Sequence, residues 1–375
     1  MRVALVHDYL VQYGGAERVL EAFCELFPDA PIYTILYDKN AMHGAFADRD
    51  IRTSFLQRSP IARRHHRLFP LLMPVAVEQF DFSQFDVVLS DSSSYAKGII
   101  THPHTLHICY LHTPTRYIWD DCQKYAQDFG FHPLIKKLVP LFLNPIRLWD
   151  RSAARRPDMI ITNSDFVRRR IAKYYRRDST VLHPPVELER FASVNRQGSF
   201  ARKYFLMTGR LIAYKRYDIV IEACNRLHLS LKIIGAGPEE KRLRQLAGDT
   251  VEFLGRVDDS ELPRYYAECR AFVFPQEEDF GIVAVEAMAS GVPVIAYRSG
   301  GAMEYLENGV TGVFFEEQTP ESVMEVLRDF DTNRYNSSRI REQTQRFDRV
   351  LFKNRIREYV DHAWQKYQDT LNRKK

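Results

Sequence analysis

Two glutamates, Glu278 and Glu286, stand eight residues apart in a stretch whose composition suits substrate binding. Two opposed carboxylates could act as the acid and the nucleophile of a glycosidase. The expected positions favour another use, because Glu278 falls in a loop and Glu286 lies about two helical turns further along. We therefore interpret Glu278 as a contact to hexose hydroxyls and Glu286 as a contact to a ribose diol.

The elements around these glutamates predict an anion site. Residues 271–275 form a short apolar strand, residues 282–289 have helical composition, and residues 294–297 favour a second strand. In such a unit the loop lies at the carboxyl edge of a parallel sheet, and the first N–H groups of the helix point outward with the positive end of its dipole. The amides expected to face the anion belong to Phe280, Gly281 and Ile282.

Two cations, Arg210 and Lys215, stand five residues apart in the loop after a second predicted strand, residues 204–209. Arginine can donate to two phosphate oxygens at once, and lysine supplies a point charge. A basic loop on its own is usually solvated surface. Together with the amides at the edge of the same predicted sheet, the two cations fit a diphosphate.

The first half of the chain offers weaker signals. Gly14 and Gly15 fall where the strand at residues 2–7 gives way to a helical pattern, so they could approach a ligand or form a plain turn. The absence of GxGxxG argues against an ordinary dinucleotide site. His112 directly follows the apolar run 106–111; a lone histidine is more often structural, but this position favours function.

The length and the order of elements predict two domains, because 375 residues exceed what one core usually holds. One βα series precedes the rigid turn at residues 183–186, where we place the hinge together with the polar residues 193–199. A second series follows it. Residues 352–371 carry one apolar helical stripe. The five cysteines, with no CxxC spacing, indicate neither a zinc site nor a disulfide framework and fit a reducing cytoplasm.

The net charge of +5 lies entirely in residues 1–184, because the remaining residues hold equal numbers of acidic and basic side chains. No nucleic-acid-binding pattern accompanies this charge, so we expect no nucleic-acid partner. The apolar run at the start of the sequence is too short for a signal peptide, and no stretch of the sequence is long and apolar enough to span a membrane. Residues 58–77 and 136–156 mix basic and apolar side chains, which suits either packing on the chain's own sheet or contact with an anionic membrane surface.

The stretch EDFGIVAVEAMASGVPVIAYRSGG, starting at Glu278, resembles the signature of the large retaining glycosyltransferase family often called family 4. The resemblance implies an α/β chain of GT-B fold, with two Rossmann-like doubly wound domains facing each other across a cleft. Residues 1–184, with a bracing helix at 352–375, would bind the acceptor, and residues 185–351 the nucleotide-sugar donor. It also implies retention of anomeric configuration, no cofactor and no metal; no DxD or His/Asp cluster stands where it could hold one.

The resemblance assigns roles residue by residue. His112 would lie beside the transferred sugar, Glu278 on the hexose, and Arg210 with Lys215 on the leaving diphosphate. The donor contacts that it implies are Gly14, Gly15, Gly235, Gly237, Arg256, Val257, Phe280, Gly281, Ile282 and Glu286. The chain departs from many relatives at Ala213-Tyr214, where a Pro-Glu or similar pair is common, and in its two basic apolar stretches.

The opening HDYLxxxGGAERV, together with LHTPTRYIWD, is most similar to bacterial mannosyltransferases that build O-antigen and exopolysaccharide repeats on a lipid carrier from GDP-mannose. A lipid-linked glycan acceptor and a cytoplasmic place, with peripheral attachment to the inner face of the plasma membrane, follow from that likeness. Two alternatives remain open. One is another reaction on the same fold, with a UDP-hexose donor, hydrolysis or epimerisation; the other is a non-catalytic scaffold associated with a membrane or nucleic acid.

Overall fold

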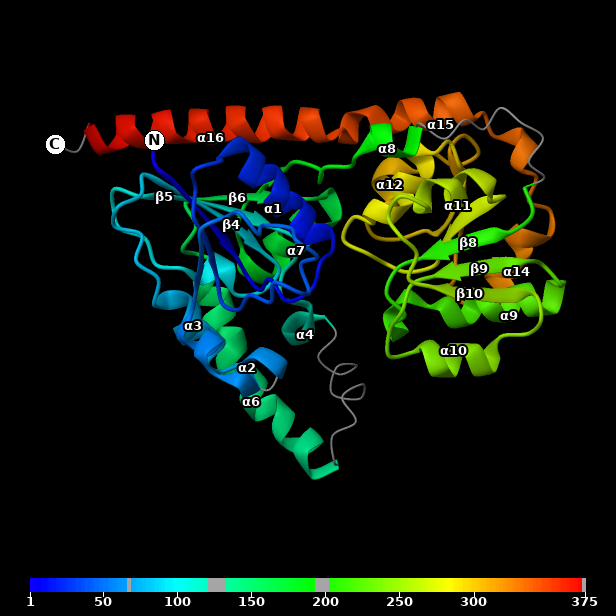
Figure 1. The fold of residues 1–375 in the computed structure, drawn as a ribbon, viewed down its shortest axis with the longest axis horizontal. Helices are drawn as coiled ribbons and strands as arrows, with labels where there is room; N and C mark the ends of the chain where they lie inside the picture. Colours follow the sequence, from blue (N-terminus) through cyan, green and yellow to red (C-terminus); the bar gives the residue numbers. More distant parts are fainter. Residues whose placement is uncertain (66–68, 121–132, 193–201, 373–375) are drawn as a thin grey trace. The chain divides into compact units, whose positions relative to one another are not determined.

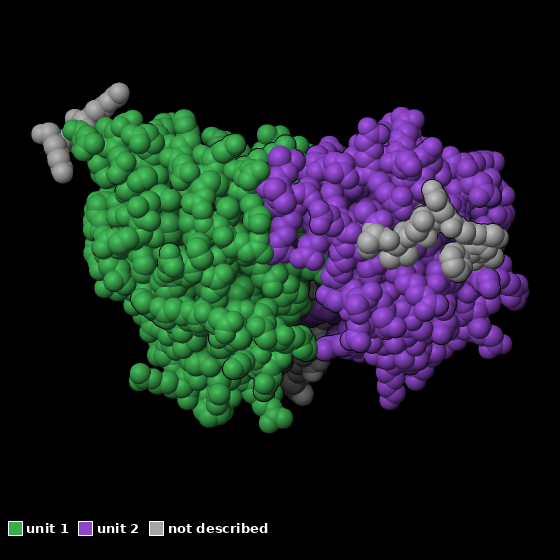
Figure 2. Space-filling view, turned by 45° about the horizontal axis from the view of Figure 1, so that its top comes forward, with its two compact units in different colours: residues 1–185, 352–375 green, residues 186–351 purple. Residues whose placement is uncertain are grey.

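The chain folds into two compact units in a computed structural model that describes residues 1–65, 69–120, 133–192 and 202–372. Unit 1 comprises Met1–Pro185 and Phe352–Lys375, and unit 2 comprises Val186–Leu351; they are coloured separately in Figure 2. The boundary at Pro185 lies within one residue of the expected hinge. The polar residues 193–199, also expected there, lie outside the described residues.

Unit 1 is built on a seven-stranded sheet in the order β3-β2-β1-β4-β5-β6-β7, in which every pairing is parallel. The central strands are buried on both faces, as the continuous apolar runs of the sequence require. The strands are β1 (Val3–His7), β2 (Ile32–Thr34), β3 (Ile51–Thr53), β4 (Val87–Ser92), β5 (Leu106–Leu111), β6 (Met159–Thr162) and β7 (Thr180–Val181).

Helices cover both faces of this sheet (Figure 1). On one face α1 (Gly15–Leu26) packs beside the long C-terminal α16 (Arg349–Asn372), and the rings of Phe23 and Phe352 stack with centroids 6.1 Å apart. The expected bracing helix is therefore present in the core of unit 1. The remaining elements of unit 1 are η1 (Phe55–Arg58), α2 (Pro60–Arg64), α3 (Met73–Glu78), η3 (Ala96–Gly98), α4 (Arg116–Trp119), α6 (Pro133–Ala153) and α7 (Asp165–Tyr175).

Unit 2 repeats this architecture with a six-stranded parallel sheet in the order β10-β9-β8-β11-β12-β13. One face is covered by α9, α10 and α14, and the other by α8, α11, α12 and α15. The strands are β8 (Phe205–Thr208), β9 (Leu231–Ile234), β10 (Val251–Gly255), β11 (Ala271–Phe274), β12 (Val294–Tyr297) and β13 (Gly312–Phe315). The helices are α8 (Leu188–Ala192), η4 (Ala213–Lys215), α9 (Tyr217–Leu227), α10 (Glu240–Leu246), α11 (Leu262–Glu268), α12 (Ile282–Ala289), α13 (Ala302–Tyr305), α14 (Pro320–Arg328), η5 (Thr332–Arg334), α15 (Ser337–Thr344) and η6 (Gln345–Phe347).

Each sheet has one point at which the strand order reverses. In unit 1 it falls between β1 and β4, and in unit 2 between β8 and β11. Ligands of open α/β sheets bind beyond the carboxyl ends of the strands at such a point, because the loops of neighbouring strands there run to opposite faces and leave a crevice. The loops after these four strands are therefore where a site is expected.

A buried ion pair fixes the segment that follows β5. Lys97 Nζ lies 2.6 Å from Asp150 Oδ1, and both side chains are about 1% exposed. Asp150 also accepts hydrogen bonds from Thr115 Oγ1 at 2.8 Å, from Trp119 Nε1 at 2.8 Å and from the Tyr175 hydroxyl at 2.7 Å. Because the buried carboxylate is fully paired, it ties α6 and α7 to the loop that carries His112.

Close loop packing at the carboxyl edge of unit 2 depends on Gly235. Its φ is +137°, and a Cβ built there would lie 1.9 Å from the carbonyl oxygen of Gly209 in the loop after β8. No side chain fits at that distance. The loops after β8 and β9 can therefore touch only because residue 235 is glycine.

We expect Gly235→Ala to destabilise the protein by about 2–4 kcal/mol, since it adds a clash with the main chain to the cost of a left-handed L-residue. Gly309→Ala is the matched control, because Gly309 also has a positive φ, +79°, but no atom within 4 Å of a built Cβ. The control should lose only about 1–2 kcal/mol. Denaturant unfolding measures both; equal losses would show that the contact between the loops is unimportant.

Candidate functional site

The switch point of unit 2 brings two of the predicted residues together. Lys215, at the end of the loop after β8, places Nζ 2.9 Å from Oε1 of Glu278, in the loop after β11. Their side chains are only 11% and 17% exposed, so water screens the pair incompletely. The Glu278 carboxylate therefore compensates the Lys215 charge.

The main chain of the Glu278 loop is held from several sides. The amide of Gly301 donates to the Glu278 carbonyl at 2.9 Å, and Gln318 Nε2 donates to the Pro275 carbonyl at 2.7 Å. Two buried tyrosines, Tyr217 and Tyr305, flank the carboxylate, and their pKa values are raised by burial and by the charge of Glu278. The Glu278 carboxylate is thus held on a fixed main chain, with the neutral hydroxyls of Tyr217 and Tyr305 near it.

Gly281 aims the start of α12 at this loop. Its φ of +93° is left-handed, and a Cβ there would lie 2.5 Å from Phe274 Cζ, so only glycine makes the turn. No side chain caps the helix at Gly281. The first N–H groups of an α-helix have no partner within the helix, so the amides that follow Gly281 suit an anion. Phe280 can offer only its main-chain amide to this site, because its ring is buried against Tyr305 and Phe347.

Glu286 does not share the position of Glu278. It lies within α12 and is 1% exposed, with Oε2 3.5 Å from the hydroxyl of Tyr266. That hydroxyl also lies 3.1 Å from Thr208 Oγ1 and donates to the Val283 carbonyl. The two glutamates are consequently a loop carboxylate in an ion pair and a buried carboxylate beside a tyrosine.

Main-chain hydrogen bonds gather the other predicted donor residues along the same edge. Gly235 N donates to the Gly255 carbonyl at 2.7 Å, and Leu211 N donates to the Ala236 carbonyl at 3.1 Å, which joins the loops after β8, β9 and β10. These loops contain Arg210, Gly235, Gly237, Arg256 and Val257. Arg210 and Arg256 are exposed, whereas Val257 packs partly on the core.

The switch point of unit 1 holds a line of ionisable side chains. His112, directly after β5 as expected, has Nε2 2.5 Å from Asp91 Oδ1, near the end of β4. The other oxygen of Asp91 lies 2.9 Å from His7 Nδ1, at the end of β1. His7 Nε2 lies 3.4 Å from Glu17 Oε1 on α1. Gly14 caps α1 and Gly15 begins it, so both glycines lie in this strand-to-helix turn, as predicted.

Asp8 fastens the two loops of that switch point to each other. Its carboxylate accepts four main-chain hydrogen bonds from the segment after β4, at 2.6–2.8 Å. Bonds from N–H donors to a carboxylate are among the stronger hydrogen bonds of proteins. The ends of β1 and β4, with His7 and Asp91 on them, are therefore held in a fixed register.

The sequence prediction missed His7, Asp91 and Glu17 as members of a site. A signal was present: His7 ends the apolar run of β1, and Asp91 is the next-to-last residue of the buried strand β4. Buried ionisable side chains are rare unless paired, so such residues at strand ends predict partners across the sheet. The pairing itself depends on β1 lying beside β4, with His7 opposite Asp91, which the linear pattern does not specify.

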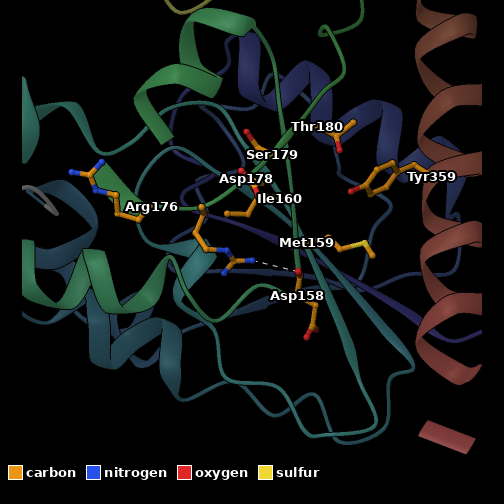
Figure 3. Close-up of a pocket in the computed structure, with 9 residues that line it drawn as sticks. Asp158, Met159, Ile160, Arg176, Asp178, Ser179, Thr180 and Tyr359 are labelled. Carbon is orange, nitrogen blue, oxygen red and sulfur yellow. Dashed lines mark hydrogen bonds between the residues drawn. The ribbon is translucent and has the colours of Figure 1, made fainter. Parts of the chain in front are cut away.

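A cavity of about 420 Å³ lies elsewhere in unit 1, lined by the starts of β6 and β7 and by Tyr359 of α16 (Figure 3). The guanidinium of Arg177 on its wall donates to the main-chain carbonyls of residues 154, 155, 157 and 158. Its charge is thus used to hold the chain. Because the amino ends of parallel strands lie at the sheet edge opposite the switch-point loops, this cavity is separate from the predicted site.

Within the described ranges, none of the helices is long and apolar enough to cross a membrane. The same ranges contain no group of three His, Cys, Asp or Glu side chains arranged to hold a metal ion. The four described cysteines, Cys24, Cys109, Cys224 and Cys269, are buried and unbridged.

Comparison with known proteins identifies relatives of both units. Residues 13–190 match the family described as Glycosyltransferase Family 4, and residues 169–347 match the family described as Glycosyl transferases group 1. The GDP-mannose-dependent alpha-mannosyltransferase of Corynebacterium glutamicum is 35% identical over 137 residues, covering 35% of this chain and 33% of that protein. The GDP-mannose-dependent alpha-(1-6)-phosphatidylinositol monomannoside mannosyltransferase of Mycolicibacterium smegmatis is 30% identical over 211 residues, covering 48% and 55%. The chain spans between a third and about half the length of these curated relatives.

Solved structures match over nearly the whole chain. The crystal structure of Anabaena HepE in complex with UDP and glucose covers 96% of this chain and 99% of its own, with a TM-score of 0.72 and 20% identity. At 20% identity the likeness shows the fold alone. With both units matched by family models and the same two-sheet architecture found in that glycosyltransferase fold, the chain belongs to glycosyltransferase family 4 and has the GT-B fold.

Proposed function

We propose that the protein is a retaining hexosyltransferase that moves a sugar from a nucleoside diphosphate to a glycan acceptor. The observation that carries this proposal is the Lys215–Glu278 ion pair at the switch point of unit 2, beside the uncapped start of α12. A cation and outward amides bind a diphosphate, and a carboxylate next to them can accept hydrogen bonds from sugar hydroxyls. Unit 2 is the donor-binding unit in this proposal, and unit 1 binds the acceptor.

Donor binding exchanges the partner of Lys215. The diphosphate, with Arg210 and the amides of Gly281 and Ile282 around it, takes the place of the Glu278 carboxylate at Nζ. Glu278 is then free to hold hexose hydroxyls. The Lys215 charge stays compensated through the exchange, and hydrogen bonds from the hexose hydroxyls replace Nζ at the Glu278 carboxylate.

The transfer step needs little covalent chemistry from the protein. We propose front-face substitution, in which an oxygen of the departing diphosphate takes the proton of the acceptor hydroxyl. The cations and amides stabilise the negative charge that grows on the leaving group, and positioning supplies the rest. In this proposal His112 contacts the transferred sugar, Glu286 the ribose, and no metal takes part, so excess chelator should leave turnover unchanged.

The rest of the donor lies along the loops of unit 2. In this proposal the base contacts the segment of Gly235, Gly237, Arg256 and Val257, while Gly14 and Gly15 of unit 1 approach the phosphate and the acceptor. Mannose from GDP-mannose is supported by the mannosyltransferase relatives, and a UDP-hexose by the UDP bound to HepE. We place GDP-mannose first, since those relatives share more sequence with this chain.

For the acceptor we propose a lipid-linked glycan of bacterial surface polysaccharide, such as O-antigen, used at the cytoplasmic face of the plasma membrane. Support comes from a surface of unit 1 around α2 and α3. Ile61, which is 61% exposed, lies on α2 with Arg63 and Arg64, and Val75, which is 55% exposed, lies on α3. Leu148 on α6 is 65% exposed. Basic and apolar side chains on short helices suit the headgroup region of an anionic bilayer.

Lys215→Ala and Arg210→Ala should each lower kcat/KM by about 100- to 1000-fold, the usual loss when one preorganised contact to developing charge is removed. Arg264→Ala is the matched control, because Arg264 is an exposed cation of the same unit whose ion pair with Glu268 lies on the surface. The control should change turnover little, since exposed pairs contribute weakly. Near-normal turnover by Lys215→Ala and Arg210→Ala would refute the mechanism.

A thermal-shift panel of sugar nucleotides identifies the donor. A ligand bound to the native state raises the Tm in proportion to the logarithm of its excess over Kd, so the true donor should give the largest shift. We expect GDP-mannose to exceed GDP-glucose and UDP-glucose, and Lys215→Ala to abolish its shift. If no sugar nucleotide shifts the Tm while duplex nucleic acid does, the scaffold alternative would replace the enzyme.

Membrane contact is tested by flotation with phosphatidylglycerol vesicles and with neutral vesicles. Arg63→Glu with Arg64→Glu should reduce flotation with the anionic vesicles, by roughly 1 kcal/mol of binding for each charge removed near the surface. Arg168→Glu with Arg169→Glu on α7 gives the same change in net charge at another exposed place. Equal losses in the two double variants would show a general charge effect and no membrane face at α2.

A further inference from the structure

Four side chains from four segments of unit 1 form one continuous hydrogen-bonded line. Glu17, His7, Asp91 and His112 follow one another at 3.4, 2.9 and 2.5 Å. Asp91 is fully buried and His7 is 4% exposed, whereas the His112 side chain is 12% exposed. The line therefore has its two inner members, His7 and Asp91, buried, and it ends at His112, the most exposed of its four side chains.

The geometry sets the charge of His7. Both ring nitrogens face carboxylate oxygens, which only accept, so both must donate and the ring is an imidazolium. Burial alone would lower the pKa of His7, but the hydrogen bonds and charges of Asp91 and Glu17 outweigh it and raise the pKa to about 10. Burial would also raise the pKa of Asp91, yet the charges and hydrogen bonds of His112 and His7 keep it below its usual range.

The thiols and the phenol near Asp91 stay neutral at neutral pH. Burial raises the pKa of Cys24 on α1 and of Cys109 on β5 to about 12, and the pKa of Tyr110 on β5 is raised as well. Asp91 is therefore a permanent carboxylate with a permanent cation on one side. It can only accept, so it orders the proton of His112 onto Nε2 and leaves Nδ1 as the ring atom open to a ligand.

We propose that His7 and Asp91 are positioning residues for glycosyl transfer, which fix the tautomer and the ring orientation of His112 so that Nδ1 meets a hydroxyl of the bound sugar. This inference rests on the proposed function, because that function supplies the sugar. The His112 ring also packs edge-on against Tyr110 with centroids 5.1 Å apart, and the main-chain carbonyl of His112 accepts a hydrogen bond from Asn163 Nδ2 at 3.0 Å. Of these contacts, only the hydrogen bond to Asp91, which His7 helps to hold in place, determines which ring nitrogen of His112 carries the proton.

Histidine-selective ¹⁵N NMR of the full chain tests the line without any substrate. In the wild type at pH 8, we expect His7 to show two protonated ring nitrogens and His112 to carry a proton on Nε2. Asp91→Asn should change the tautomer balance of His112. Ordinary titration of His7 near its unperturbed value, or a His112 signal that ignores Asp91→Asn, would overturn the proposal.

Kinetics test whether the line serves the reaction. Asp91→Asn should lower kcat at least about 10-fold with the donor KM little changed, as replacement of an outer partner of a catalytic histidine generally does. Asp91 acts through His112, so adding Asp91→Asn to His112→Gln should cost less than about 2-fold more. If the losses of kcat from the two substitutions multiply in the double variant, Asp91 has a merely structural role and the proposal is refuted.

The matched control is His107→Gln. His107 lies on β5, is fully buried and bonds Ser90 Oγ at 2.8 Å, but it is outside the line, and burial lowers its pKa to about 3. This control should shift the Tm and leave kcat within about 2-fold of the wild type, because buried polar groups affect stability wherever they lie. If the wild type transfers no sugar from any sugar nucleotide, the proposed function fails, and the NMR result decides the line alone.

Stability against pH gives a further readout of the same line. The folded-state pKa of His7 is raised to about 10, so its stabilisation is fully present below its unfolded value of 6.5 and is lost as the pH rises through 10. The Tm difference between the wild type and His7→Gln should thus be largest near pH 6 and shrink towards pH 10. A difference that grows over that range would contradict a cationic His7.

Discussion

The ion pair between Lys215 and Glu278 is the contact on which the donor site depends. An unpaired Lys215 cation would be costly at this partly buried place on the edge of the unit 2 sheet, and the Glu278 carboxylate removes that cost. In the proposed function the diphosphate of the donor replaces Glu278 at Lys215, and the same carboxylate then meets the sugar.

Both units place a pair of charged side chains at the point where the strand order of the sheet reverses. A parallel sheet buries its strands between helices and leaves only loop residues at the carboxyl edge, where the reversal of strand order opens a crevice. In unit 2 Lys215 and Glu278 pair in the loops after β8 and β11. In unit 1 the buried side chains of His7 and Asp91 pair towards the ends of β1 and β4. Glycines at 235 and 281 permit the close turns, and the four amides around Asp8 fix the register of the other sheet.

Much of the fold was predictable because apolar runs and turn residues dictate it locally. The strands Leu106–Leu111 and Val294–Tyr297 and the helix Ile282–Ala289 begin and end where the sequence pattern places them. The edge strand Ile51–Thr53 was not predicted, since its three residues are partly exposed and carry an arginine. Gly312–Phe315 was also missed, because it begins with glycine and is too short to show a period.

Only those parts of the candidate site that lie within one local segment of the sequence were predictable. The loop, the turn at Gly281 and the helix behind it follow from the residues between Glu278 and Ala289. That segment lies within residues 169–347, which match the family described as Glycosyl transferases group 1, so its glycosyltransferase resemblance is confirmed. The Lys215–Glu278 contact joins residues 63 positions apart and the His7–Asp91 contact joins residues 84 apart. Such contacts depend on which strands become neighbours, which no local pattern encodes. The deep burial of Glu286 beside Tyr266 was likewise not foreseen.

The most direct measurement is a crystal structure of the chain with its sugar nucleotide bound. The account predicts that Lys215 Nζ leaves the Glu278 carboxylate and lies within hydrogen-bond distance of a phosphate oxygen, with Glu278 on the hexose hydroxyls. A bound donor whose diphosphate lies elsewhere while Lys215 and Glu278 keep their 2.9 Å contact would contradict it.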